Sequence, residues 1–130
     1  MLADSPIVPM LPVVNLERAR RFYEGKLGLP LIDDLSADDA LVFQCGAGTR
    51  LAMYQRAAPT RTDHTAAIWV VADVEDTVRQ FIASGILFEP YDMPGLKTNE
   101  LGIADIGIER TAWFKDPDGN ILGIVQFVDP

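Results

Sequence analysis

The stretch Val13–Tyr23, VVNLERARRFY, decides how the first half of the chain folds. Asn15 is a good helix N-cap, because its side-chain oxygen can accept a free backbone N–H of the first turn. The apolar residues that follow recur at spacings of three and four and share one helix face: Leu16, Ala19, Phe22, Tyr23 and Leu27. Gly28 then supplies the usual C-terminal residue. The sequence therefore predicts a helix over residues 15–27.

Short β-rich segments surround this helix. The segment Ile7–Val14 precedes it, and its two prolines donate no backbone hydrogen bond, so we expect a strand that lies at a sheet edge or pairs irregularly. Three more strands are predicted after the helix, at Leu29–Leu35, Ala40–Cys45 and Arg50–Gln55. Gly46–Thr49 is typical of a hairpin loop. The first half therefore has the order βαβββ.

The second half repeats this order. Aligning Asn15 with Asp73, the N-cap of a second predicted helix that ends at Gly85, offsets the halves by 58 residues. Strands are predicted at Thr65–Val71, Ile86–Tyr91, Ile108–Phe114 and Asn120–Phe127. The repeat is inferred from the order of the elements, because few residues are identical between the two halves of the chain. Residues 57–63 are predicted to be the linker, and residues 93–106 a long Gly-rich connection of the kind that often forms a lid or binding loop.

Length and composition predict a single domain spanning residues 1–130, with modules at about 7–56 and 64–128. The chain is 48% hydrophobic and 23% charged, which excludes a disordered protein. One cysteine, no signal peptide and no long apolar run predict a cytoplasmic protein with no membrane partner. The net charge of −8 argues against nucleic acid and suits cationic small molecules.

Two motifs together resemble a known superfamily. Val13–Tyr23 with Leu27-Gly28-Leu29, and Phe114–Leu122 (FKDPDGNIL), are similar to signatures of the vicinal oxygen chelate proteins, which include glyoxalases, bleomycin resistance proteins and extradiol dioxygenases. The resemblance spans about residues 7–127. It implies an α+β fold in which two tandem βαβββ modules form a cup-shaped half-barrel sheet with the helices outside. It also implies a homodimer.

The resemblance further locates where a metal ion would bind. Metal-dependent members use four ligands, typically His, Glu, His and Glu, from the first and last strands of each module. Carried over by position, these ligands fall on Val8, Ala52, Ala66 and Gly123. None of these side chains can bind a metal. We therefore expect a member that lacks the family's metal centre and any other cofactor.

Strand alternation predicts which side chains face the cup. Glu109, Thr111 and Trp113 share one side of their strand, because Phe114 is expected in the core. The residues predicted to contact a ligand are Met10, Arg50, Tyr54, His64, Ile68, Glu109 and Trp113. A mostly apolar wall with a few polar groups is typical of a small-molecule pocket.

Some of these residues have structural alternatives. His64 could be a surface or capping residue, Glu109 could form an ion pair with Arg110 or Arg50, and Trp113 could serve packing alone.

Three functions follow from this pattern. The first is metal-free binding, of the sequestration type, of a small, partly aromatic molecule, with cationic molecules included. The second is a metal-dependent lyase, isomerase or dioxygenase with a displaced site that uses His64 and Glu109. The third is metal-free acid–base catalysis by either of these two residues.

Overall fold

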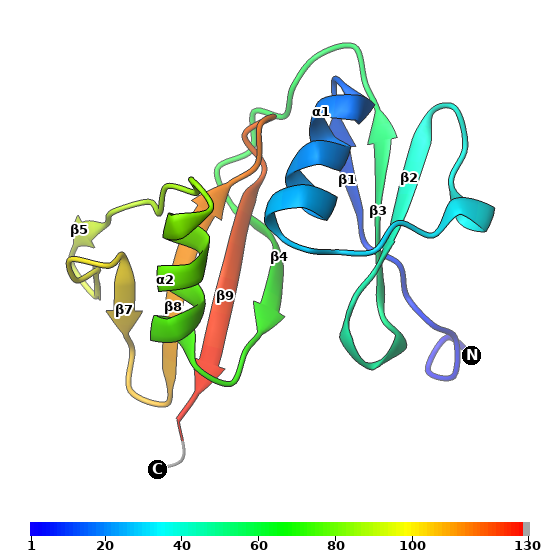
Figure 1. Cartoon of the computed structure of the whole chain (residues 1–130). Helices are drawn as coiled ribbons and strands as arrows, with labels where there is room; N and C mark the ends of the chain where they lie inside the picture. The colour runs from blue at the N-terminus through cyan, green and yellow to red at the C-terminus, as the bar shows by residue number, and fades with distance from the viewer. Residues whose placement is uncertain (129–130) are drawn as a thin grey trace. The chain divides into compact units, whose positions relative to one another are not determined.

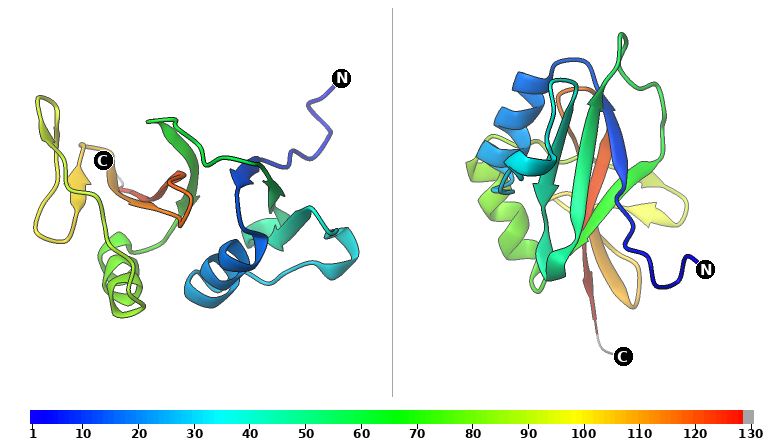
Figure 2. Two further views of the ribbon diagram at one scale, coloured as in Figure 1. Left: turned by 90° about the horizontal axis from the view of Figure 1, so that it is seen from above. Right: turned by 90° about the vertical axis from the view of Figure 1, so that its right-hand side faces the viewer.

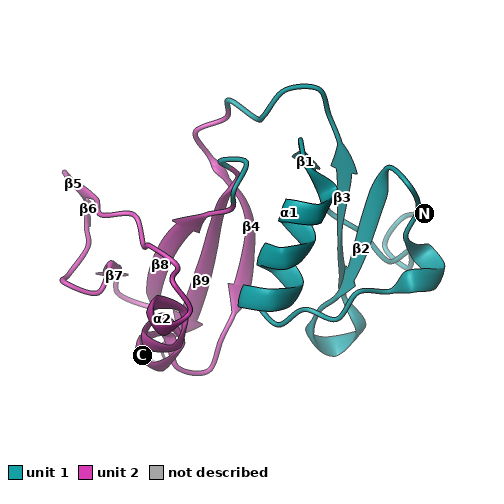
Figure 3. Ribbon diagram, turned by 45° about the horizontal axis from the view of Figure 1, so that its top comes forward, with its two compact units in different colours: residues 1–61, 117–119 teal, residues 62–116, 120–130 magenta. Residues whose placement is uncertain are grey.

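The chain folds as two compact units, each with its own sheet and helix, and the computed structural model describes residues 1–128 (Figure 3). Unit 1 comprises residues 1–61 together with residues 117–119. Unit 2 comprises residues 62–116 and the chain from residue 120 onward. The boundary between residues 61 and 62 falls inside the predicted linker. Neither sheet closes into a barrel within the described chain, and the combination of helices and sheets confirms the predicted α+β class.

The sheet of unit 1 has the order β1-β3-β2 (Figure 1). β1 (Met10–Val13) runs parallel to β3 (Arg50–Gln55), and β2 (Ala40–Gln44) is antiparallel to β3. β1 lies at the edge of this sheet, which is one of the two arrangements that its prolines predict. Alternate side chains of the three strands are buried and form the core: Leu11, Val13, Leu41, Phe43, Leu51 and Met53.

The first helix is α1 (Leu16–Arg20), and the π-helical segment η1 (Arg21–Lys26) continues it. Asn15 accepts the backbone N–H of Arg18, as predicted for a cap, and Phe22 and Tyr23 are buried. The helix ends at Gly28, whose φ of 72° lies in the left-handed region that glycine adopts without strain. α1 covers one face of its sheet (Figure 2).

The second helix, α2 (Val74–Ala83), is capped by Asp73 and ends at Gly85 in a Schellman motif, in which the Ile86 N–H donates to the Phe81 carbonyl. The first helix has one residue more between its cap and its glycine. The π-helical segment accommodates this residue, because the Leu27 N–H donates five residues back, to Phe22. The single-residue mismatch between the repeats is thus absorbed inside the helix, and both helices still end at a glycine.

The sheet of unit 2 has the order β4-β9-β8-β7. Its strands are β4 (Thr65–Val70), β7 (Ile103–Asp105), β8 (Glu109–Lys115) and β9 (Ile121–Phe127). β4 is parallel to β9, and β8 is antiparallel to both β9 and β7. α2 covers one face of this sheet (Figure 2), where Phe114 contacts Phe81 and Phe88 edge-on at ring distances of 5.7 and 5.6 Å.

Three sequence-based expectations were wrong in detail. Leu29–Leu35 and Ile86–Tyr91 are not regular strands and form only isolated bridges, at Leu31 and Phe88. A proline without an N–H interrupts each segment, and a 3-10 turn occupies Asp33–Leu35. The connection at residues 93–106 is not a continuous loop. It contains part of the hairpin β5 (Asp92–Met93) and β6 (Leu96–Lys97), followed by β7.

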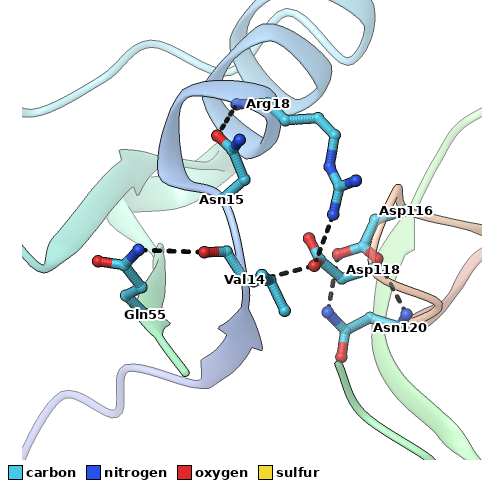
Figure 4. Close-up of polar contacts among 7 residues, drawn as sticks. All are labelled: Val14, Asn15, Arg18, Gln55, Asp116, Asp118 and Asn120. Atoms are coloured by element: carbon cyan, nitrogen blue, oxygen red, sulfur yellow. Dashed lines mark hydrogen bonds and ion pairs between the residues drawn. The ribbon is translucent and has the colours of Figure 1, made fainter. Parts of the chain in front are cut away.

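The turn before β9 carries a network of buried polar groups. Asp116 and Asn120 close the turn by two hydrogen bonds between Asp116 carboxylate oxygens and the Asn120 N–H and side-chain amide, at 2.9 and 2.8 Å (Figure 4). Asp118, at its tip, is fully buried, and its Oδ1 accepts the Val14 N–H and the Arg18 guanidinium, each at 2.9 Å. The tip therefore belongs to unit 1, although the strands around it belong to unit 2.

Among residues 1–128, no helix has the length and apolar character needed to cross a membrane.

Replacing Asp118 by alanine should destabilise the protein by about 2 kcal/mol, because it leaves the half-buried Val14 N–H and the half-exposed Arg18 guanidinium without their acceptor. The matched control is Glu24→Ala, which removes a carboxylate from the exposed Arg20–Glu24 pair and should cost less than about 1 kcal/mol. Urea unfolding of both variants measures the difference. Equal losses would show that the Asp118 contacts contribute no more than a surface ion pair.

Candidate functional site

A pocket of about 410 Å³ lies on the face of the unit 2 sheet that α2 leaves open. This volume is within the range of small-molecule sites. Strands β4 and β8 supply its lining, which consists of Thr65, Ala66, Ala67, Ile68, Glu109, Thr111 and Trp113. All of these residues belong to unit 2, so that unit alone defines the pocket.

The strand register positions the two side chains that form the apolar wall of the pocket, Ile68 and Trp113. Trp113 pairs with Gly123 of β9, and Gly123 pairs with Ile68 of β4, so the three positions form a row across the sheet. A Cβ atom on Gly123 would lie 3.2 Å from Ile68 Cγ1 and 3.4 Å from Trp113 Cδ1. The missing side chain of Gly123 therefore lets Ile68 and Trp113 lie close together over the sheet.

Tyr91 packs against Trp113 but is not one of the residues that line the pocket. Its ring meets Trp113 edge-on, at 5.3 Å between centroids and 86° between planes. The segment that carries Tyr91 is fixed beside β8 by a backbone hydrogen bond, in which the Glu89 N–H donates to the Trp113 carbonyl at 2.8 Å. Burial, and secondarily the negative charge of Glu89, raise the pKa of the Tyr91 phenol above its usual value of 10.0. Tyr91 is thus a neutral aromatic group at physiological pH.

Two polar side chains complete the pocket. Thr111 is only 3% exposed, and its Oγ1 has no hydrogen-bond partner within residues 1–128. The cross-strand neighbours of Thr111, Ala104 and Val125, are apolar. An unsatisfied buried hydroxyl costs about 1–3 kcal/mol. Glu109 is partly exposed and has no ion-pair partner among the described residues, so the expected pairing with Arg110 or Arg50 is not formed.

The structure brings together three of the seven residues predicted to contact a ligand: Ile68, Glu109 and Trp113. His64 is exposed, precedes β4 and does not line the pocket. Its predicted orientation assumed regular alternation. The register shift between Thr65 and Ala67 breaks that alternation just after His64. The role of His64 in binding stays a prediction.

The other three predicted residues, Met10, Arg50 and Tyr54, belong to unit 1. Met10 pairs with Ala52, and Tyr54 and Arg50 flank Ala52 at two-residue spacing, so the three share a sheet face as expected. The Arg56 guanidinium carbon lies 5.9 Å from the Tyr54 ring centroid, within cation–π distance. Their contact with a ligand also stays a prediction.

Thr111 and Tyr91 were not among the residues predicted from the sequence to contact a ligand. Alternation placed Thr111 on the correct face, but only the structure shows that its hydroxyl is buried without a partner. Tyr91 falls in a segment that was expected to be a strand, and its contact with Trp113 depends on tertiary packing. No local sequence signal could have identified either feature.

The four family ligand positions do not offer metal donors. Val8 is 40% exposed and precedes β1, Ala52 is buried in β3, Ala66 lies at the register shift, and Gly123 lies under Ile68. Within residues 1–128, no three His, Cys, Asp or Glu side chains gather at a spacing that would hold an ion. The residues therefore do not fit the family's metal centre, which needs three or four ligands.

Comparison with known proteins gives the family. The model of the Glyoxalase/Bleomycin resistance protein/Dioxygenase superfamily matches residues 7–124. A search of curated protein sequences found no significant match. The chain belongs to the glyoxalase/bleomycin resistance protein/dioxygenase superfamily.

Solved structures support the same fold. A glyoxalase/bleomycin resistance protein/dioxygenase from Alicyclobacillus acidocaldarius is 19% identical, with a TM-score of 0.70 over 97% of this chain and 93% of its own. A lactoylglutathione lyase from Agrobacterium tumefaciens is 19% identical, with a TM-score of 0.66 over 95% and 93%. An antibiotic-binding protein from a Streptomyces species is 21% identical, with a TM-score of 0.63 over 98% of both chains. At these identities, the likeness concerns the fold.

Protein purified without chelator should contain much less than one equivalent of divalent metal, because the described residues offer no donor cluster. Elemental analysis by mass spectrometry measures this content, and EDTA should leave the melting temperature unchanged. A stoichiometric transition metal that EDTA removes, with a fall in melting temperature, would contradict this expectation.

Proposed function

We propose that this protein binds a small, partly aromatic molecule in the pocket of unit 2 without a metal ion, and that it acts by sequestration. The observation that carries the proposal is the pocket itself, which is lined by an indole and an isoleucine beside one unsatisfied hydroxyl and one carboxylate. Mostly apolar walls with few polar groups bind organic molecules by burying their surface and orienting them.

The aromatic part of the ligand is supported by Trp113. An aromatic ring that stacks on the indole face or meets its edge contributes more than its buried area alone. Tyr91 already occupies one side of Trp113 in an edge-on contact, which limits the positions that the indole ring can adopt. The wall is therefore preorganised, and binding loses little side-chain entropy.

The charge of the protein supports ligands that are neutral or cationic. The net charge is −8, and the only ionisable group that lines the pocket in the described chain is Glu109. A negative field attracts cations and repels anions. The fold likeness to an antibiotic-binding protein agrees with sequestration as the mode of action.

An enzymatic function has weaker support. A displaced metal site built from His64 and Glu109 lacks a third donor in the described chain, and His64 does not line the pocket. Metal-free acid–base catalysis by Glu109 has the support that its carboxylate does line the pocket. A binding function requires no reactive group in the pocket. Catalysis by Glu109 would instead give measurable turnover, and the Glu109→Gln variant would lose it.

A library of aromatic amines, aromatic amides and antibiotics should contain compounds that raise the melting temperature and quench Trp113 fluorescence. The chain has two tryptophans, so Trp69→Phe leaves Trp113 as the only reporter. We expect Trp113→Ala to weaken binding of such compounds by tenfold or more, about 1.4 kcal/mol or more. The control Leu87→Ala removes an apolar side chain that is 85% exposed and lies outside this pocket, and it should not change binding. Binding that survives in the folded Trp113→Ala variant would place the ligand elsewhere.

A further inference from the structure

Glu109, Thr111 and Trp113 form a row along one face of β8. Residues two apart on a strand are separated by about 7 Å, so the row extends over about 13 Å. It presents a carboxylate, a hydroxyl and an indole in that order. The residues between them, Arg110 and Ala112, project to the opposite face of the sheet.

Thr111 is the unusual member of this row. Its cross-strand neighbours Ala104 and Val125 are both apolar and at most 2% exposed. Valine has nearly the same shape as threonine and would place no polar atom among these neighbours. The hydroxyl of Thr111 has no partner within the described chain, so it adds a desolvation penalty that the fold does not recover. A polar group on a bound molecule would supply the missing partner.

Glu109 provides a second constraint on what can bind. Its carboxylate lines the pocket, and no basic side chain in the described chain forms an ion pair with it. A ligand cation at this end would form a charge-assisted hydrogen bond with the carboxylate. An anionic group would be repelled by Glu109 and by the net charge of the protein.

We infer that Thr111 and Glu109 determine specificity, and that the ligand is an aryl ring joined through an amide-like linker to a protonated amine. This inference rests on the proposed binding function. The ring lies against Trp113, the linker forms a hydrogen bond with Thr111 Oγ1, and the amine reaches Glu109. The order of these groups along the ligand follows the order of the side chains along β8.

Three matched probes test this assignment: N-(3-aminopropyl)benzamide, which is cationic at pH 7, the neutral N-(3-hydroxypropyl)benzamide, and the anionic 4-benzamidobutanoate. Their dissociation constants are measured by titration followed by NMR at low salt. We expect the amine to bind about tenfold tighter than the alcohol, and the carboxylate to bind weakest. In Glu109→Gln the amine and the alcohol should bind equally, and in wild type added salt should reduce their difference.

The Thr111→Val variant gives a signature that a purely structural threonine would not produce. Without ligand, its melting temperature should rise, because the variant no longer buries an unsatisfied hydroxyl. Its affinity for the cationic probe should fall about fivefold, because the linker loses its hydrogen bond. Thr111→Ser keeps a hydroxyl and should restore most of the affinity. The two effects of Thr111→Val therefore have opposite signs.

Other outcomes separate this inference from the proposed function. Equal binding of the three probes, with binding still lost in Trp113→Ala, would overturn the specificity assignment and leave aromatic binding intact. Failure of all three probes to bind at 10 mM, roughly the upper limit of such titrations, would also overturn it. A Thr111→Val variant that is less stable than wild type would show that the hydroxyl has a structural partner.

Discussion

The buried carboxylate of Asp118 holds the Pro117–Gly119 turn against the start of the first helix, and the packing of unit 1 depends on this interaction. It accepts a backbone N–H from Val14 and the guanidinium of Arg18, and both lie in the stretch that begins the first helix. The two motifs that carry the family resemblance, VVNLERARRFY and FKDPDGNIL, are therefore in direct contact in the structure (Figure 4). Because Asp118 has no exposed side-chain surface, the turn that carries it cannot move away without exposing a carboxylate and leaving two donors unpaired. That turn leads directly into β9, whose Gly123 lies between Trp113 and Ile68.

The two apolar side chains of the proposed binding pocket lie beside a strand position, Gly123, at which the family resemblance places a metal ligand. Its lack of a side chain lets these two apolar side chains close over the strand. Glycine at this position therefore offers no metal donor and leaves room for an apolar wall. The polar groups that remain, Thr111 and Glu109, come from β8 and not from the expected ligand positions. They suit recognition by hydrogen bonding and charge, not coordination of an ion.

The sequence predicted the elements that local rules determine. Both helices, their caps at Asn15 and Asp73 and their terminal glycines are confirmed, because capping and helical periodicity depend on neighbouring residues. The faces of β3 and β8 are also as predicted, since alternation needs no tertiary information. The prediction failed where long-range context decides. The segments interrupted by Pro30 and Pro90 form too few backbone pairings to become strands. The register shift at Ala66 breaks the alternation from which the orientation of His64 was predicted. The isolation of the Thr111 hydroxyl depends on which strands pair with β8.

The central claim is that the open face of the unit 2 sheet, and not a metal centre, is the functional site of this chain. Chemical-shift mapping of the ¹⁵N-labelled protein with a bound aromatic ligand tests it most directly. The account predicts that the largest perturbations fall on residues 65–68, on alternate residues of β8 from Glu109 to Trp113, on Gly123 and on the Trp113 indole N–H. Perturbations centred on unit 1 or on the outer surface of α2, with these signals unchanged, would contradict it.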